Sequence, residues 1–260
     1  MKLADRLRHR IKGGLATLGY RVQGTRYCPR QLLEPGLLRR LEFDDVVCRL
    51  MFEVGRELRF VQVGAFDGIT KDPLRKYIQT CGWRGVLIEP QPRPAAQLRE
   101  LYGDNSRIVV LEAALDRRHG KRTLFTVESD NVPTWARGMA SFQRENIVKN
   151  SHVVPGVEAM IKELFVNCIT FEDVMQSLPS DRLDLLQVDA EGADGHILSL
   201  FRFDLLKPAI VHWESKNMTK SQQEEVLDML RMYGYRFARS GQEDMLAVVD
   251  LEKSPPRICR

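Results

Sequence analysis

The stretch FVQVGAFDG, Phe60–Gly68, joins a strand-like apolar run to a turn of small residues, and the run GVLIEP, Gly85–Pro90, ends in the acid Glu89. A small-residue turn after a buried strand lets backbone N–H groups approach a ligand, and a carboxylate after the next strand can accept hydrogen bonds from two ribose hydroxyls. The pairing predicts an adenosine-containing cofactor at the carboxyl edge of a parallel sheet. The turn lacks the full G-x-G-x-x-G spacing, which disfavours a nicotinamide dinucleotide.

Strands and helices alternate from Phe60 onward, which predicts a parallel sheet with helices on both faces. The expected strands are Phe60–Val63, Gly85–Ile88, Ile108–Leu111, Leu185–Val188 and Ala209–Trp213. The expected helices are Pro73–Thr80, Pro94–Tyr102, Phe171–Ser177, Ala193–Phe201 and Lys220–Tyr233.

Two short apolar runs near the end of the chain, Tyr235–Arg239 and Met245–Val249, flank a polar turn at Gly241. They predict a hairpin whose last strand enters the sheet antiparallel to the others. The sequence therefore favours an α/β fold of the class I methyltransferase, Rossmann-like type over a dehydrogenase. Its sheet would have seven strands, mostly parallel, closed by the antiparallel hairpin strand.

Residues 1–58 have a different pattern from the predicted catalytic domain at 59–252, and we expect a helical segment that packs on that domain, forms a lid or mediates dimerisation. Apolar residues recur at helical spacing between basic ones at Leu3, Leu7, Ile11, Leu15 and Leu18. Such a helix can lie on an anionic membrane surface, but Gly13 and Gly14 interrupt it early, which favours packing on the domain or on a second subunit. A second helical segment is expected to cover Pro35–Arg56.

A long insertion, Arg117–Asn167, separates the third and fourth predicted parallel strands. Its first part, Lys121–Glu128, is expected to form a strand, whereas the remainder has no clear period. Long segments at the carboxyl edge of such a sheet commonly cover the substrate, so the insertion is interpreted as a substrate lid.

The composition is that of a globular protein: 260 residues, 43% hydrophobic and 28% charged, with a net charge of +4. The charge is spread along the chain, which argues against a nucleic-acid partner. Five scattered cysteines disfavour a disulfide framework and a zinc site, and they favour a reducing, cytoplasmic location. No apolar stretch approaches the roughly 20 residues that span a bilayer.

Three further carboxylates follow predicted strands. In LLQVDAEGADG, Leu185–Gly195, a strand ends at Asp189 and Glu191 follows before a helix; in VHWESKN, the next strand ends in Glu214. Such acids can act as a general base, orient a hydroxyl or hold a divalent ion, with Asp189 and Glu214 as the candidate metal pair. The alternative is that Asp189 or Glu191 caps the following helix. His212 is expected to be a satisfied core residue rather than a catalytic one.

Several of these segments make the chain resemble the FkbM family of S-adenosylmethionine-dependent methyltransferases over roughly Phe60–Val249. The matching segments are FVQVGAFDG, GWRGVLIEPQP at Gly82–Pro92, EAALD at Glu112–Asp116 and LLQVDAEGADGHIL at Leu185–Leu198. The last is the most specific, because a D-x-E-G-x-[ED] sequence marks the family.

The resemblance implies O-methylation of sugar, glycan or polyketide hydroxyls with S-adenosylmethionine as the cofactor and a small-molecule or glycan acceptor. The residues that it assigns to the cofactor are Gly64, Ala65, Phe66, Asp67, Gly68, Glu89, Pro90, Ala114, Asp116 and Asp189. Asp189 or Glu191 would act as the base, with Glu214 completing the site and no metal required; a Mg²⁺ ion on Asp189 and Glu214 is the second version.

Two residues depart from the family pattern. Many relatives have an acid at the position of Gln62 and an asparagine at that of Phe66. Gln62 can hydrogen-bond the amino-acid end of the cofactor but cannot form an ion pair with its ammonium. A catalytically degenerate methyltransferase-like scaffold is therefore the alternative function.

Overall fold

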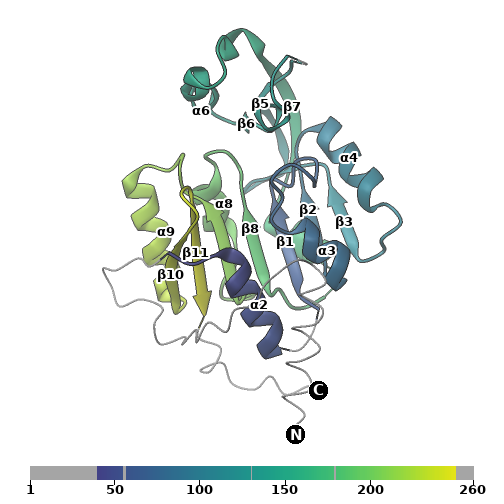
Figure 1. The fold of residues 1–260 in the computed structure, drawn as a ribbon, viewed down its shortest axis with the longest axis vertical. Coiled ribbons are helices and arrows are strands. Elements are labelled where there is room, and N and C mark those ends of the chain that lie inside the picture. Colours follow the sequence, from purple (N-terminus) through teal and green to yellow (C-terminus); the bar gives the residue numbers. More distant parts are fainter. Residues whose placement is uncertain (1–39, 55–56, 130, 179, 250–260) are drawn as a thin grey trace, which may run out of the picture.

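The computed structural model describes residues 40–54, 57–129, 131–178 and 180–249. Its main sheet has seven strands in the order β10-β11-β9-β8-β1-β2-β3 (Figure 1). Their bounds are β1 Arg59–Val63, β2 Arg84–Ile88, β3 Ile108–Leu111, β8 Leu185–Val188, β9 Ile210–Glu214, β10 Tyr235–Ser240 and β11 Asp244–Val249.

The pairing within this sheet confirms the predicted fold class. Strands β3, β2, β1, β8 and β9 pair in parallel, whereas β11 pairs antiparallel with both β9 and β10. Most residues of β1, β2, β8 and β9 are buried, as expected for strands covered by helices on both faces. Each predicted strand is present, with ends shifted by a residue or so.

Helices cover both faces of the sheet (Figure 1). On one face, Val61, Val188 and Val211 pack against α7 (Phe171–Ser177), α8 (Asp194–Leu200) and α9 (Lys220–Met232). On the other, Phe60 and Leu185 pack against α2 (Phe43–Val54), α3 (Arg75–Cys81) and α4 (Pro92–Tyr102). Alternating side chains of each strand therefore supply two separate cores.

Helix α2 is the described part of the N-terminal segment. It buries Phe43, Val46, Val47 and Leu50 against the sheet, so this part packs on the catalytic domain. The predicted basic amphipathic helix around Leu3–Leu18 lies outside the described residues. No helix in the described ranges is both long and apolar enough to cross a membrane.

Most of the insertion forms a lobe with its own sheet, in the order β4-β7-β5-β6. These strands are β4 Ala114–Leu115, β5 Gly120–Val127, β6 Ala140–Ser141 and β7 Ile161–Ile169, and the short helices between them are α5 Thr134–Arg137, α6 Arg144–Val148, η2 Lys149–His152 and η3 Val157–Met160. The predicted strand at Lys121–Glu128 is confirmed as β5. The remainder has no clear period in the sequence, yet it contains a second long strand, because β7 pairs with β5 over Ile161–Cys168.

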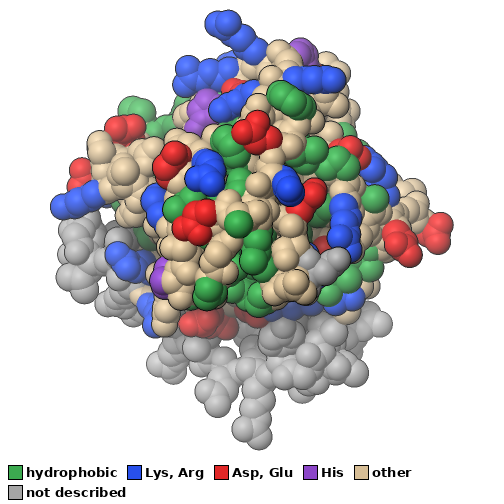
Figure 2. Space-filling view, turned by 90° about the horizontal axis from the view of Figure 1, so that it is seen from above, with side chains coloured by type: hydrophobic (Ala, Val, Ile, Leu, Met, Phe, Trp, Pro, Cys, Tyr) green, Lys and Arg blue, Asp and Glu red, His purple; other side chains and the backbone are tan. Residues whose placement is uncertain are grey.

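The lobe lies beyond the carboxyl ends of the parallel strands (Figure 1). Seen from the lobe side, acidic and basic side chains are interspersed with apolar ones, so both charges share this face (Figure 2). The lobe faces the edge of the sheet where the predicted site residues lie, at the carboxyl ends of the parallel strands (Figure 1).

Candidate active site

A cavity lies between the carboxyl edge of the main sheet and the lobe. Nine of the residues predicted from the sequence line it: Gly64, Ala65, Phe66, Glu89, Pro90, Ala114, Asp189, Glu191 and Glu214. The lobe contributes Trp135, Met139, Ser141 and Phe142 to the same cavity. Three predicted residues, Asp67, Gly68 and Asp116, do not line it.

The turn after β1 brings the backbone close to the loop after β8. Gly64 has φ +80°, and a Cβ added to it would lie 1.7 Å from the carbonyl oxygen of Asp189. Only glycine permits this approach. Phe66 also has positive φ, +46°, which is uncommon for a bulky residue. The turn is thus strained where it faces the cavity.

Glu89 follows β2 and is fixed by two backbone donors. The N–H of Phe66 donates to its Oε2 at 2.9 Å, and the N–H of Gln91 donates to its Oε1 at 2.9 Å. Burial raises the pKa of this carboxyl to about 7, although the two N–H groups oppose the shift. A carboxylate oxygen has about two lone-pair sites, so each oxygen retains capacity to accept from a ligand hydroxyl.

Asp67 and Gly68 shape the turn from outside the cavity. Asp67 Oδ1 accepts from the N–H groups of Ile69 and Thr70 at 2.8 and 2.7 Å, and its Oδ2 accepts from the Thr70 hydroxyl at 2.7 Å. A Cβ on Gly68 would lie 2.7 Å from Cδ2 of Leu98, so this glycine allows α4 to pack closely. Both residues therefore act on the fold of the turn.

Asp116 lies beside the cavity, where it binds the lobe to α8. Its carboxylate accepts from Arg122 Nη1 at 2.6 Å, and His196 Nε2 lies 3.3 Å from its Oδ1. The Arg122 guanidinium stacks on the ring of Phe142, 3.9 Å from its centroid. The neighbouring Ala114, by contrast, lines the cavity.

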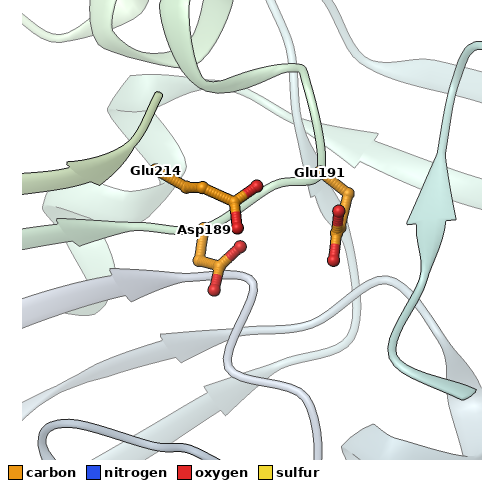
Figure 3. A group of neighbouring side chains, drawn as sticks. All are labelled: Asp189, Glu191 and Glu214. Carbon is orange, nitrogen blue, oxygen red and sulfur yellow. The ribbon is translucent and has the colours of Figure 1, made fainter. Parts of the chain in front are cut away.

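Three carboxylates converge in the cavity where β8 and β9 end, two and three strands along the sheet from β2 and Glu89 (Figure 3). Asp189 and Glu214 follow the adjacent parallel strands β8 and β9, and Glu191 faces them from the loop; ligand oxygens from all three lie within 4.8 Å of one another. Asp189 is exposed to solvent in the cavity, Glu191 is half-buried and Glu214 is buried. Burial and the neighbouring negative charges raise the pKa of all three carboxyls.

Lys216 and Asn217 bind this carboxylate group. Lys216 Nζ lies 2.6 Å from Glu214 Oε1 and 3.7 Å from Glu191 Oε2. Burial alone would lower the pKa of the ammonium, but Glu191 and Glu214 raise it overall. Asn217 Nδ2 donates to Glu191 Oε2 at 3.2 Å and to Glu214 Oε2 at 3.3 Å. One ammonium therefore already serves as counter-ion to the group.

The loop that carries Glu191 is held from both sides. Asp194 is buried and accepts from the N–H groups of Ala190 and Gly192, at 3.3 and 3.1 Å. From the lobe, the Ser141 hydroxyl and Asn146 Nδ2 donate to the carbonyl of Glu191, at 2.9 and 3.3 Å. Helix α8 has no side-chain cap, so the structure does not support the alternative in which Asp189 or Glu191 caps it.

A row of polar side chains crosses the sheet below the cavity. Gln62, Gln187 and His212 occupy matching positions on β1, β8 and β9. His212 Nδ1 lies 2.6 Å from Gln187 Oε1, and burial lowers the pKa of this histidine to about 3, so it is neutral. His212 also packs on Phe43 of α2, with ring centroids 4.5 Å apart. It is a buried core residue, as the sequence predicts, but it is not fully satisfied, because its Nε2 has no hydrogen-bond partner among the described residues.

Sequence reasoning missed several site residues. Lys216 and Asn217 stand inside the quoted VHWESKN, and Asp194 is the last acid of the D-x-E-G-x-[ED] pattern, so each had a local signal. Ser141 and Asn146 belong to the lobe and had none, because their contact with Glu191 spans about 50 residues of chain.

The fold, the small-residue turn and the carboxylate that follows β2 define a class I methyltransferase. A family model described as "Methyltransferase FkbM domain" matches residues 62–237. The chain therefore belongs to the FkbM methyltransferase family, as the resemblance implies.

Solved structures with a similar fold come from distant proteins. A methyltransferase FkbM from Methylobacillus flagellatus has 14% identity and a TM-score of 0.45, over 74% of this chain and 43% of that one. The N-terminal domain of human METTL16 in complex with SAH has 12% identity and a TM-score of 0.41, over 96% of this chain and 84% of that one. A search of curated proteins gave no match.

Proposed function

We propose that this protein is an S-adenosylmethionine-dependent O-methyltransferase that acts on a hydroxyl of a sugar, glycan or polyketide-type small molecule. The observation that carries the proposal is one cavity with two unlike ends. One end has the backbone-fixed carboxylate Glu89, and the other has the group of Asp189, Glu191 and Glu214.

The residues at the first end fit the cofactor. Glu89 retains lone pairs for the two ribose hydroxyls, and Gly64 lets the turn after β1 lie close to the backbone of Asp189 at the cavity wall. Ala113, Ala114 and Leu115 line the cavity beyond Glu89, on the side where an adenine would lie. The bound cofactor supplies an activated methyl group on its sulfonium.

The second end has groups that can prepare an acceptor. An alcohol is a weak nucleophile near neutral pH and gains from a base that accepts its proton. Asp189 or Glu191 would accept this proton, and their raised pKa values suit the role. Glu214 is held by Lys216 and completes the orientation of the group.

The metal-free version of this mechanism is favoured. Lys216 Nζ already contacts Glu214 and neutralises part of the charge that would attract Mg²⁺. In a metal-free mechanism, EDTA leaves turnover unchanged. Loss of turnover with EDTA and recovery with Mg²⁺ would instead support the version with the ion on Asp189 and Glu214.

The lobe would act as the substrate lid. Its residues Trp135, Met139 and Phe142 line the cavity opposite the sheet, so they can contact the part of the acceptor that surrounds the reacting hydroxyl. Aromatic rings next to hydrogen-bonding groups suit a sugar or polyketide, which present both apolar faces and hydroxyls.

The test is calorimetric binding of S-adenosylmethionine and S-adenosylhomocysteine to the wild type and to Glu89→Ala. We expect binding by the wild type and its collapse in the variant, with Glu100→Ala, an exposed residue of α4, as the control that binds normally. A glycan and polyketide acceptor screen follows. A folded wild type that binds neither compound would contradict the proposal and favour the degenerate scaffold.

A further inference from the structure

Two acceptor atoms beside the cofactor end of the cavity make no hydrogen bond within the described chain. They are Oδ2 of Asp72 and Oε1 of Gln62. Both residues line the cavity, and Gln62 is only 3% exposed. Buried acceptors without a donor are unfavourable, so such a pair indicates a donor that arrives with a ligand.

The other atoms of the two side chains are firmly held. Asp72 Oδ1 accepts from the N–H of Leu74 at 2.8 Å and from Gln62 Nε2 at 3.2 Å. These bonds fix one edge of each group and leave the remaining oxygen of each as an acceptor. Neither open oxygen is reached by solvent, but the last torsion of an aspartate is broad, so a small rotation can present Oδ2 to a ligand.

The two acceptor oxygens of Asp72 and Gln62 determine which chemical group of a ligand can bind there. One carboxylate oxygen and one amide oxygen attract a donor that carries positive charge, and they repel a carboxylate or phosphate. Burial raises the pKa of Asp72, although the backbone N–H groups of Leu74 and Arg75 and the side chain of Gln62 oppose the shift. A primary ammonium, with three donors, matches the two open acceptors.

The position of the pair relative to Glu89 points to one part of the cofactor. Gln62 lies on β1, next to β2, and Glu89 follows the end of β2; Ala114 follows β3, which pairs with β2 on its other side. A cofactor with its ribose at Glu89 and its adenine near Ala114 extends its amino-acid portion toward β1. We propose that Asp72 and Gln62 form the subsite for the ammonium group of this amino-acid portion, an inference that rests on the proposed function.

This assignment accounts for the departure at Gln62. The glutamine carries no charge that could pair with an ammonium, and the structure places Asp72 in hydrogen-bond contact with it. Asp72 supplies the negative charge from ten residues further along the chain, and Gln62 contributes a neutral acceptor. The ammonium therefore still has an ion-pair partner.

The experiment compares two ligands on Asp72→Asn by calorimetry. S-Adenosylhomocysteine has the amino-acid portion, and 5′-methylthioadenosine lacks it. The asparagine retains Oδ1 for Leu74 and Gln62 but replaces the open oxygen by an NH₂ donor. We expect affinity for S-adenosylhomocysteine to fall about 10- to 100-fold, while affinity for 5′-methylthioadenosine stays within about twofold.

Two other variants keep the test decisive. Gln62→Met removes the neutral acceptor and should weaken S-adenosylhomocysteine alone, about 5- to 10-fold; it also serves if Asp72→Asn does not fold. Asp67→Asn changes the other carboxylate of the turn, which does not line the cavity, so it should affect both ligands alike.

The outcomes separate the two proposals. Equal losses for both ligands in Asp72→Asn, an unchanged S-adenosylhomocysteine affinity or a tighter one would overturn the ammonium subsite and leave the proposed function in place. The tighter binding would mean that Asp72 faces the ligand carboxylate. A wild type that binds neither ligand would overturn the proposed function together with the subsite.

Discussion

The sheet edge and the lobe face the same cavity but hold their groups in different ways. On the sheet side, strand ends and backbone donors fix the carboxylates, as the N–H groups of Phe66 and Gln91 fix Glu89. On the lobe side, polar contact with the reacting region runs through the side chains of Ser141 and Asn146 to one carbonyl, that of Glu191. We therefore expect sheet variants to abolish chemistry or folding and lobe variants to change acceptor affinity modestly.

The largest expected effect is on the sheet side, in Asp189→Asn. Asparagine keeps the size of the side chain but cannot accept a proton, so turnover should fall about 10²- to 10⁴-fold while S-adenosylmethionine still binds. Single-turnover kinetics with an accepted substrate measures the loss. Asp181→Asn, an exposed residue before β8, should retain full rate. Full activity in Asp189→Asn would remove this residue from the mechanism.

A matched pair of glycines compares the stability of the two sides. Gly64 and Gly156 of the lobe have similar φ, +80° and +74°, but a Cβ on Gly156 has no atom within 4 Å, whereas one on Gly64 lies 1.7 Å from a carbonyl oxygen. Gly156→Ala should lower the free energy of unfolding by about 1 kcal/mol and Gly64→Ala by about 3 kcal/mol or more. Urea denaturation measures the free energy of unfolding of both variants. Equal losses would show that the turn at Gly64 can shift to accommodate the added Cβ.

The seven-stranded sheet could be predicted from the sequence because its strands are apolar runs whose type does not depend on distant partners. Val61, Val86 and Val188 are buried within such runs. Strand β7 could not be recognised in the same way. It alternates buried Val166 and Cys168 with exposed residues such as Phe165, which is 72% exposed, and its register depends on pairing with β5 about 40 residues earlier.

The residues of the candidate site also differ in whether the local sequence could reveal them. Glu89, Asp189 and Glu214 could be found because a carboxylate after a buried strand is a local signal. Asp72 was missed because its significance comes from one unpaired oxygen and from contact with Gln62, which are properties of the folded chain. The resemblance assigns Asp67 to the cofactor by its position in the turn, whereas the structure shows its oxygens bonded within the turn.

A smaller effect on the sheet side is the pH dependence of cofactor affinity. The pKa of Glu89 in the free protein is raised to about 7, chiefly by burial, and ribose hydroxyls donate best to its ionised form. Affinity is therefore lost as pH falls through this pKa, by about 10-fold between pH 8 and pH 6. Calorimetry with 5′-methylthioadenosine measures the profile without an amino-acid portion. Glu89→Gln should bind weakly with a flat profile, and a persisting slope would assign the titration to another group.

The smallest effect belongs to the lobe, in Asn146→Ala. The substitution removes the donor from Asn146 to the Glu191 carbonyl but leaves the one from Ser141, so a loss of about 1 kcal/mol is expected. Because Glu191 lies at the acceptor end, this loss should appear as a rise of about fivefold in KM for the acceptor, with cofactor affinity unchanged. Glu163→Ala, an exposed residue of β7, is the control. A fall in kcat as large as that of Asp189→Asn would mean that the lobe holds the reacting groups as firmly as the sheet does, and the two sides of the cavity would then act as one unit.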